Sequence, residues 1–260
     1  MQPDRELALV TGASSGIGRQ CALVLAERGF DLAITARRQD RLKDLKGEIE
    51  SRHGVGATVL VEDLSAAGGP ERLADAVGQL ARPLSVLVNN AGFGYYGPVT
   101  EARLAEVQAT IQVNVNALTT LVRLLAPAMR ERRHGHILNV SSFAALQPIP
   151  LYAVYSGAKA YVVAFSLALR HELRRSGVKV TVVCPGFTAT EFHDVARHRK
   201  TGIMRRTTLS SESVARQALA GMFRGKAMVV PGAAYKLTGL ALRFMPRTWA
   251  SAMAAAVVKN

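Results

Sequence analysis

The sequence is poor in cysteine and has no long apolar run. Only Cys21 and Cys184 occur among its 260 residues. Two cysteines are too few for a disulfide framework, and each lies in an apolar run as a core thiol does, which favours a reducing, cytoplasmic setting. No uncharged apolar stretch approaches the roughly 18 residues that cross a bilayer. The charged residues before the first apolar run do not resemble a signal peptide, so we expect none.

Acidic residues are also scarce, since 19 of them face 33 basic ones and leave a net charge of +14. From residue 201 onward, nine basic residues face Glu212 alone. This excess suits nucleic acid, a membrane surface, or an anionic cofactor or substrate. Nucleic-acid readers interleave basic residues with stacking aromatics, whereas the tail from residue 232 onward offers only Tyr235, Phe244 and Trp249. With no recognisable reader module, we expect no nucleic-acid partner.

Short apolar runs alternate with helical patterns along the chain. Strand character is predicted at Leu7–Val10, Leu32–Thr35, Ala57–Val61, Ser85–Val88, His136–Val140, Lys179–Val183 and Ala227–Val230. Helical periodicity is predicted at Gly16–Arg28, Gln39–Arg52, Pro70–Leu80, Glu101–Arg132, Leu151–Arg175 and Ser211–Phe223. Strands buried on both faces and joined by helices form parallel sheets. The sequence therefore predicts one doubly wound α/β domain over residues 1–260, with a seven-stranded parallel sheet flanked by helices on both faces.

Two segments depart from this alternation. Residues 187–209 form a long, polar and basic stretch, which predicts a substrate lid because loops of that length in compact domains are usually functional. Residues 232–257 are apolar but interrupted by basic residues, and Leu237, Leu240 and Phe244 follow helical spacing. We expect this amphipathic tail to cover the substrate cleft or contact another subunit. The alternative is a peripheral contact with anionic lipid.

A glycine-rich turn joins the first expected strand to the first expected helix. It reads Thr-Gly-Ala-Ser-Ser-Gly-Ile-Gly over residues 11–18. Glycines permit a tight turn and close backbone approach, so that a pyrophosphate rests on the N–H groups at the positive end of the helix. Because glycine is common in loops, the position between strand and helix is what favours a dinucleotide site.

The second expected strand ends in Ala36, Arg37 and Arg38. A site for NAD(H) usually has an acidic residue here to bind the adenosine ribose. Guanidinium groups instead pair with a 2′-phosphate through charge-assisted hydrogen bonds. The sequence therefore favours NADP(H), with NAD(H) as a possible cofactor. In the alternative interpretation the two arginines only begin a solvated helix.

Tyr155 and Lys159 lie four residues apart in an expected helix, which places both side chains on one face. A phenol is a poor base at neutral pH, and a neighbouring cation favours its ionised form. The pair is therefore a plausible proton-transfer unit for a carbonyl and alcohol couple. Taken alone, such a pair is usually ordinary surface. Tyr152 and Tyr161 have no lysine four residues later and are interpreted as packing residues.

Several motifs together resemble the short-chain dehydrogenase/reductase family, in its form of about 250 residues. The likeness covers the chain to about Pro231. It rests on the turn at residues 11–18, Asp63, Asn89-Asn90-Ala91-Gly92, Asn114, Ser141-Ser142, Tyr155 with Lys159, and Pro185-Gly186. The resemblance implies a Rossmann-like fold and hydride transfer between a nicotinamide cofactor and a carbonyl or alcohol.

The resemblance implies four catalytic residues. Tyr155 would be the general acid in reduction and the base in oxidation, and Lys159 would lower the pKa of Tyr155 and bind the nicotinamide ribose. Ser142 would hold the substrate oxygen, and Asn114 would anchor a water that links Lys159 to solvent. Ser141 is interpreted as a structural hydroxyl at a strand end.

The resemblance also implies the cofactor contacts. Asp63 would accept from the adenine amino group, while Asn89 would tie neighbouring strands together. The expected contacts are Gly12, Ser14, Ser15, Gly16, Ile17, Gly18, Arg37, Arg38, Asp63, Leu64, Asn90, Ala91, Gly92, Tyr155, Lys159, Pro185, Gly186 and Thr188. Many NADP-preferring members have a basic residue at the position of Ser15, so the preference for NADP(H) depends on Arg37 and Arg38.

A metal site is not expected, because the closest histidine pairs, His134 with His136 and His193 with His198, lack carboxylates or cysteines at ligand spacing. The expected function is an NADP(H)-dependent carbonyl reductase or alcohol dehydrogenase for a small molecule. The alternative is a noncatalytic NADP-binding regulator on the same fold. A homodimer or homotetramer is expected through the helices at 101–132 and 151–175. An apolar substrate, either acyl or ring-containing, is suggested by Phe93, Tyr95, Tyr96, Phe187, Phe192, Ile203 and Met204.

Overall fold

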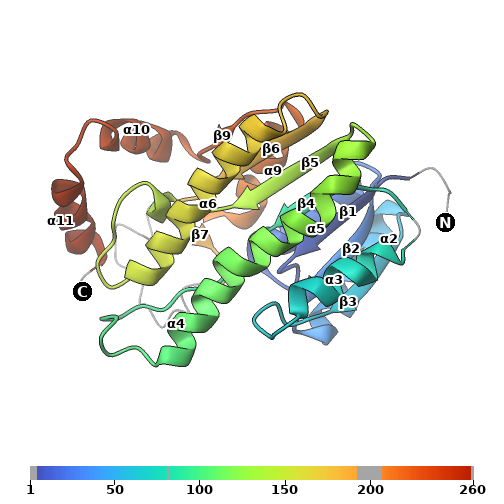
Figure 1. Cartoon of the computed structure of the whole chain (residues 1–260), viewed down its shortest axis with the longest axis horizontal. Coiled ribbons are helices and arrows are strands. Elements are labelled where there is room, and N and C mark those ends of the chain that lie inside the picture. The colour runs from blue at the N-terminus through green and yellow to red at the C-terminus, as the bar shows by residue number, and fades with distance from the viewer. Residues whose placement is uncertain (1–4, 81, 192–206, 259–260) are drawn as a thin grey trace.

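The protein is a parallel sheet covered by helices on both faces (Figure 1). The computed structural model describes residues 5–80, 82–191 and 207–258. The strands of the sheet are β1 (Leu7–Thr11), β2 (Asp31–Ala36), β3 (Ala57–Val61), β4 (Leu84–Asn89), β5 (Gly135–Val140), β6 (Val178–Val183) and β9 (Met228–Val229). They lie in the order β3-β2-β1-β4-β5-β6-β9, and every pairing is parallel. The expected seven-stranded parallel sheet is confirmed.

The central strands are buried along their whole length. Every residue of β1 and β4 is buried, which explains why both read as continuous apolar runs rather than as alternating patterns. β1 pairs with β2 on one side and with β4 on the other, so the winding of the chain reverses between β1 and β4. In open α/β sheets, ligands bind beyond the carboxyl ends of the strands at such a reversal.

Two sets of helices cover the sheet. On one face lie α1 (Gly16–Glu27), α2 (Gln39–His53) and α9 (Ser211–Phe223). On the other face lie α3 (Gly69–Gly78), α5 (Leu118–Glu131) and α6 (Ala153–Glu172), with α4 (Leu104–Ile111) leading into α5. Figure 1 shows α4, α5 and α6 as long neighbouring helices across this face. The two layers enclose the cores that hold the strand ends in place.

The two longest expected helices differ from the structure. The helix expected at 101–132 begins at Leu104, and its middle turn, Gln112–Ala117, is a π-helix between α4 and α5. Asn114 lies in that turn, and its side chain donates to backbone carbonyls. The helix expected at 151–175 is the shorter α6, because Leu151 has a φ of 65° and lies outside the right-handed helical region.

The expected lid and tail are only partly loops. The lid at 187–209 contains β7 (Thr188–Ala189) and β8 (Leu209–Ser210), which pair in parallel, while its residues 192–206 lie outside the described residues. The tail forms two helices, α10 (Ala233–Leu242) and α11 (Arg247–Val258), beside the carboxyl end of the sheet (Figure 1). Within the described ranges, no helix combines the length and the apolar character needed to cross a membrane.

Candidate active site

The glycine turn lies between β1 and α1, as expected. Gly12 has a φ of 65°, and a side chain there would come within 2.8 Å of Asn90 Nδ2. Asn90 Nδ2 donates to the carbonyl oxygens of Thr11 (2.9 Å) and Gly12 (3.2 Å) and so shapes the turn. No side chain caps the N-terminus of α1 at Ser15. The turn therefore presents backbone N–H groups to an anion, which is the chemistry that a pyrophosphate needs.

The turn opens into a cleft of about 640 Å³ at the carboxyl ends of the strands. Every expected site residue lines this cleft except Gly18 and Asn114. Gly18 lies behind the turn, where a side chain would collide with Gly12 and Asn90, so it permits close packing and does not face the cleft. Asn114 lies behind Gly92, which lines the cleft itself.

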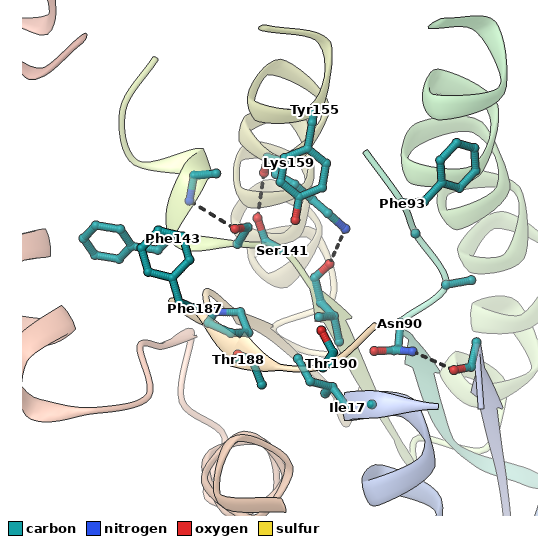
Figure 2. Close-up of a pocket in the computed structure, with 18 of the residues that line it drawn as sticks. Ile17, Asn90, Phe93, Ser141, Phe143, Tyr155, Lys159, Phe187, Thr188 and Thr190 are labelled. Atoms are coloured by element: carbon teal, nitrogen blue, oxygen red, sulfur yellow. Dashed lines mark hydrogen bonds between the residues drawn. The ribbon is translucent and has the colours of Figure 1, made fainter. Parts of the chain in front are cut away.

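Tyr155 and Lys159 project from α6 into the cleft, as Figure 2 shows. Burial raises the pKa of Tyr155 to about 12, and a hydrogen bond with Ser142 opposes this shift. Lys159 Nζ lies 5.8 Å from the centre of the Tyr155 ring and donates to the carbonyl oxygen of Val140 at 2.9 Å. Desolvation of the phenolate thus outweighs the hydrogen bond with Ser142, and the expected lowering of the Tyr155 pKa by Lys159 stays a prediction.

Two polar groups, Lys159 Nζ and Asn114 Oδ1, lie near Gly92. Burial lowers the pKa of Lys159 to about 8. Asn114 Nδ2 donates to Phe93 O (2.8 Å) and Thr110 O (2.9 Å), whereas Asn114 Oδ1 is buried with no hydrogen-bond partner in the described part of the chain. A side chain at Gly92 would contact Asn114 Oδ1 and lie 3.2 Å from Lys159 Nζ. The glycine thus leaves space between the two polar groups, which fits a bridging water.

Two neighbouring residues have structural roles, as the sequence indicated. Asn89 Nδ2 donates to Asn139 Oδ1 at 2.9 Å and links β4 to β5. Ser141 Oγ donates to the carbonyl oxygen of Lys159 at 2.7 Å (Figure 2). This contact ties the end of β5 to α6 and so positions the helix that carries the tyrosine and the lysine.

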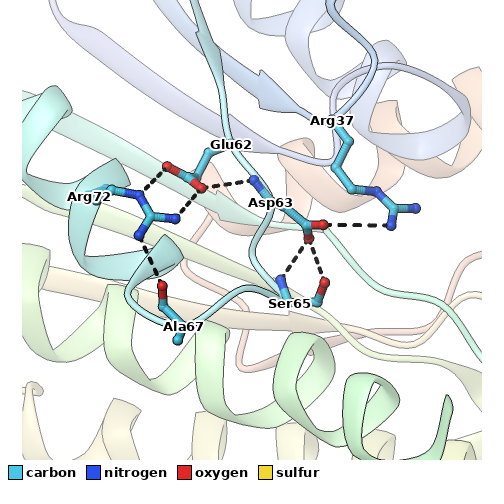
Figure 3. Close-up of polar contacts among 6 residues, drawn as sticks. All are labelled: Arg37, Glu62, Asp63, Ser65, Ala67 and Arg72. Carbon is cyan, nitrogen blue, oxygen red and sulfur yellow. Dashed lines mark hydrogen bonds and ion pairs between the residues drawn. The ribbon is translucent and has the colours of Figure 1, made fainter. Parts of the chain in front are cut away.

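Asp63 follows β3 at the far end of the cleft. Its Oδ1 accepts from Ser65 N (2.9 Å) and Ser65 Oγ (2.6 Å), and its Oδ2 lies 4.0 Å from Arg37 Nη1 (Figure 3). Partial burial opposes ionisation, but the Ser65 hydrogen bonds and the Arg37 charge hold the pKa of Asp63 below its usual value. The side chain is therefore an ionised acceptor at the cleft, as an adenine amino group would require.

The two adjacent arginines separate. Arg37 lies near Asp63, whereas Arg38 Nη2 donates to Ser14 Oγ (3.0 Å) and Ser15 Oγ (2.9 Å) in the glycine turn. Arg38 therefore sits with the hydroxyls expected to meet phosphate, and Arg37 sits beside the expected adenine acceptor. The shared phosphate site that the sequence suggested is divided between two places.

Comparison with known proteins agrees with this geometry. The family model described as short chain dehydrogenase matches residues 6–201. The chain belongs to the short-chain dehydrogenase family. Among solved structures, it resembles a short-chain dehydrogenase from Sphingobium yanoikuyae in complex with NADPH, with a TM-score of 0.83, 29% identity, and coverage of 91% of this chain and 92% of that one.

A second solved relative contains the other nicotinamide cofactor. It is a short-chain dehydrogenase/reductase from Burkholderia phymatum in complex with NAD, with a TM-score of 0.82, 25% identity, and coverage of 92% of this chain and 93% of that one. A relative found by sequence comparison is the very-long-chain 3-oxoacyl-CoA reductase of Anas platyrhynchos, which is 36% identical over 73% of this chain. The chain spans only 62% of that relative's length.

The structure adds a site residue that sequence reasoning missed. The ring of Tyr235, from α10, packs against Gly186 where a side chain would otherwise lie. Its hydroxyl accepts from Phe187 N (3.0 Å) and donates to Thr207 O (3.1 Å). The only signal in the sequence was one aromatic residue at the start of an unexplained tail.

The tail of the chain lines the cleft as well, as a role as a cleft cover would require. Its lining residues are Tyr235, Thr238, Leu242, Met253, Ala254, Val257 and Val258. Tyr152, interpreted from sequence only as a packing residue, also lines the cleft, because Leu151 turns the chain inward before α6 begins. Of the expected apolar substrate contacts, Phe93 and Phe187 line it, whereas Tyr95 and Tyr96 do not. The other three, Phe192, Ile203 and Met204, lie outside the described residues.

Proposed function

We propose that this protein is an NADP(H)-dependent oxidoreductase that interconverts a carbonyl and an alcohol on an apolar small molecule. The observation that carries the proposal is the convergence of Tyr155, Ser142 and Lys159 on one cleft that begins at a phosphate-binding glycine turn. A noncatalytic nucleotide-binding protein has no need of this proton-transfer group. The solved relatives that contain NADPH and NAD support a nicotinamide cofactor.

The residues around the turn fit NADP(H). The uncapped start of α1 and the Ser14 and Ser15 hydroxyls suit phosphate oxygens, and Arg38 adds a guanidinium at the same place. Ionised Asp63 suits the adenine amino group. When bound, the nicotinamide supplies or accepts the hydride. The positive charge beside the turn favours the phosphorylated cofactor over NAD(H).

The protein's own residues move the proton. Tyr155 remains protonated at neutral pH, because burial raises its pKa to about 12. In carbonyl reduction its O–H bond breaks and the proton passes to the substrate oxygen, to which Ser142 donates a hydrogen bond. The Lys159 ammonium returns a proton to the phenolate, and a water held by Asn114 Oδ1 resupplies Lys159 from solvent. In alcohol oxidation the proton takes the reverse path.

The cleft suits an apolar substrate. Aromatic and aliphatic side chains from distant parts of the chain line it, namely Phe93, Phe143, Phe187, Leu242 and Met253. Because the sequence relative is named a very-long-chain 3-oxoacyl-CoA reductase, we propose 3-oxoacyl thioesters as the first substrate class and other hydrophobic ketones as the second.

A consumption assay tests this function. NADPH oxidation is followed with 3-oxoacyl thioesters, steroids, aliphatic ketones and aldehydes, and is repeated with NADH. Tyr155→Phe should reduce turnover by about 100-fold or more, which is the range of general acid catalysis, while NADPH affinity changes by less than threefold. Tyr161→Phe, an exposed phenol bonded to Thr119, is the matched control and should keep full turnover. Undiminished turnover in Tyr155→Phe would refute the mechanism, and NADPH binding without any turnover would favour the noncatalytic alternative.

A homodimer or homotetramer is also proposed, assembled through α4, α5 and α6. These helices expose large apolar side chains that water disfavours, namely Leu104, Ile111, Leu124, Tyr161 and Leu167. Exposed apolar patches on a protein surface mark interaction sites. The face formed by the three helices therefore supports assembly of identical subunits.

The outer surface of the tail supports a peripheral contact with anionic lipid, at the cytoplasmic location proposed for this protein. None of the ten residues of α10 is buried, and Leu237 and Phe244 are 70% and 84% exposed. Trp249 on α11 is 68% exposed. No acidic residue follows Glu212 in the sequence. Exposed apolar groups among cations suit a negatively charged bilayer surface.

A further inference from the structure

Two arginines beside the glycine turn are joined to one acidic side chain from a distant part of the sequence. Arg38 Nη1 lies 2.7 Å from Glu191 Oε2, and Arg41 Nη1 forms an ion pair with Glu191 Oε1. Glu191 comes shortly after β7, and 153 residues separate it from Arg38. Each of its carboxylate oxygens thus binds a different guanidinium.

The same carboxylate lies beside the phosphate-binding turn. Thr190 packs over Gly16, where an added side-chain carbon would come within 2.7 Å of the Thr190 methyl group. Arg38 bonds Glu191 while it also donates to the Ser14 and Ser15 hydroxyls. Glu191 lines the large cleft together with these serines. Arg38 lines the cleft as well, whereas Arg41 lines an adjoining hollow that Ser14, Ser15 and Glu191 share. The carboxylate therefore occupies donors at the edge of the cofactor site.

These donors suit a phosphate better than a carboxylate. Two guanidinium groups and two hydroxyls form a cluster with a charge of +2 before Glu191 is counted. A phosphate monoester carries about two negative charges and three oxygens at neutral pH, whereas Glu191 supplies one charge and two oxygens. Both anions cannot use the same N–H groups. The side chains of Arg38, Arg41 and Glu191 are 44%, 49% and 38% exposed, so the ion pairs can exchange with solvent.

We propose that Glu191 determines cofactor specificity by competing with the 2′-phosphate of NADP(H) for Arg38 and Arg41. In the free protein the carboxylate holds both arginines. Binding of NADP(H) must displace it, whereas NAD(H) has no group that requires these donors. Glu191 thus weakens NADP(H) binding selectively and narrows the preference that the arginines create. This inference rests on the proposed function, since it concerns the cofactor of that site.

Equilibrium binding tests the competition. Dissociation constants for NADPH and NADH are measured by fluorescence titration on the full chain, for the wild type and for Glu191→Gln. Removing the carboxylate should tighten NADPH about fivefold, because two partly exposed ion pairs no longer oppose the phosphate. NADH affinity should change by less than twofold. Glu212→Gln is the matched control, because it removes a carboxylate that pairs with Arg216 outside the cleft, and it should leave both constants within twofold.

A second variant tests whether Glu191 competes with the 2′-phosphate for the arginines or instead holds the arginines in place for it. With Arg41→Gln in the background, the gain from Glu191→Gln should fall below twofold, since one of the contested donors is missing. Equal tightening of NADPH and NADH would overturn the proposal in favour of general electrostatics. Weaker NADPH binding in Glu191→Gln would overturn it too, since the carboxylate would then orient the arginines. If the wild type binds neither NADPH nor NADH, the proposed function is refuted as well. If it binds both, and Glu191→Gln has no selective effect on NADPH, this inference alone is refuted.

Discussion

At the scale of single residues, the buried ammonium of Lys159 is the least ordinary group in the molecule. The residue is 4% exposed, and its Nζ donates to one backbone carbonyl, that of Val140, at 2.9 Å. Removal from water disfavours the charged form, which is why its pKa falls to about 8. A lysine that titrates near neutral pH can exchange a proton with a neighbouring phenolate, as the proposed mechanism requires.

This shift predicts a pH-dependent stability. The folded chain releases the Lys159 proton near pH 8, and the unfolded chain only near 10.5, so the unfolded chain binds more protons between these values. The stability contributed by Lys159 should therefore rise with pH across that window. Relative to Lys159→Met, the wild type should gain about 2 kcal/mol of unfolding free energy between pH 7 and 9.5.

Urea unfolding of both proteins at each pH gives this difference. The range stays below pH 10, because Tyr155 has the opposite effect once an unfolded phenol begins to ionise. Lys46→Met is the control for the loss of a lysine side chain, because Lys46 is half-buried on α2 and pairs with Glu50 away from the cleft. A difference between wild type and Lys159→Met that is constant from pH 7 to 9.5 would mean that Lys159 titrates as an ordinary lysine.

At the scale of elements, the Tyr235 side chain of α10 links several segments that line the cleft. The Tyr235 hydroxyl bonds both Phe187 N and Thr207 O, which come from the segments leading into β7 and β8. Its ring lies 5.2 Å from that of Phe143 and against Gly186. The helix has no buried residue, so these contacts attach it to the sheet.

Removing the Tyr235 hydroxyl should weaken substrate positioning in the cleft and leave Tyr155, Ser142 and Lys159 unchanged. Tyr235→Phe should raise the KM for substrate about fivefold, keep kcat within threefold, and lower the unfolding free energy by about 1–2 kcal/mol, since two hydrogen bonds of the Tyr235 hydroxyl are lost. Steady-state kinetics and urea unfolding measure these effects. Tyr161→Phe provides the comparison, because its phenol bonds Thr119 away from the cleft. A loss of kcat with unchanged KM would contradict a positioning role.

The π-helical turn between α4 and α5 also belongs to this scale. Asn114 Nδ2 donates to Phe93 O and Thr110 O, and this leaves Oδ1 directed toward the space beside Gly92. Such turns often occur at functional sites, because the extra residue re-aims a side chain. The sequence pattern over these residues is that of one continuous helix, so the turn was not predicted.

At the scale of the whole molecule, positive charge and exposed apolar groups coincide on the tail. The protein should sediment with vesicles of phosphatidylcholine and phosphatidylserine. It should sediment less with phosphatidylcholine alone, which lacks anionic headgroups, and less at high salt, because screening weakens contact with those headgroups. Phe244→Ser combined with Trp249→Ser should lower bound protein at least fivefold. Val61→Ser, which removes an exposed apolar group elsewhere, should not.

Light scattering on the same samples separates this contact from subunit assembly. The tail variant should keep the mass of the wild type, because assembly is proposed through α4, α5 and α6. If the tail variant has a smaller mass and the wild type does not bind vesicles, the tail is a subunit interface instead.

Much of the fold could be predicted because its signals are local. The strands β1 and β4 are buried at every residue and therefore read as apolar runs, and the glycine turn follows β1 directly. Tyr155 and Lys159 share a helix face by their spacing alone. Helix ends were less predictable, since Leu151 adopts a left-handed conformation that depends on the packing around it.

The sequence by itself determined the parallel sheet, the place of the phosphate-binding turn and the residues of the proton-transfer group, because periodicity and short spacing act along the chain. Only the tertiary structure decided that Arg37 and Arg38 separate, that Tyr235 closes the cleft, and that Glu191 meets Arg38 across 153 residues. Such contacts depend on how distant segments pack, and no local pattern encodes them. The excess positive charge of the sequence acquires its meaning only when its partners in space are known.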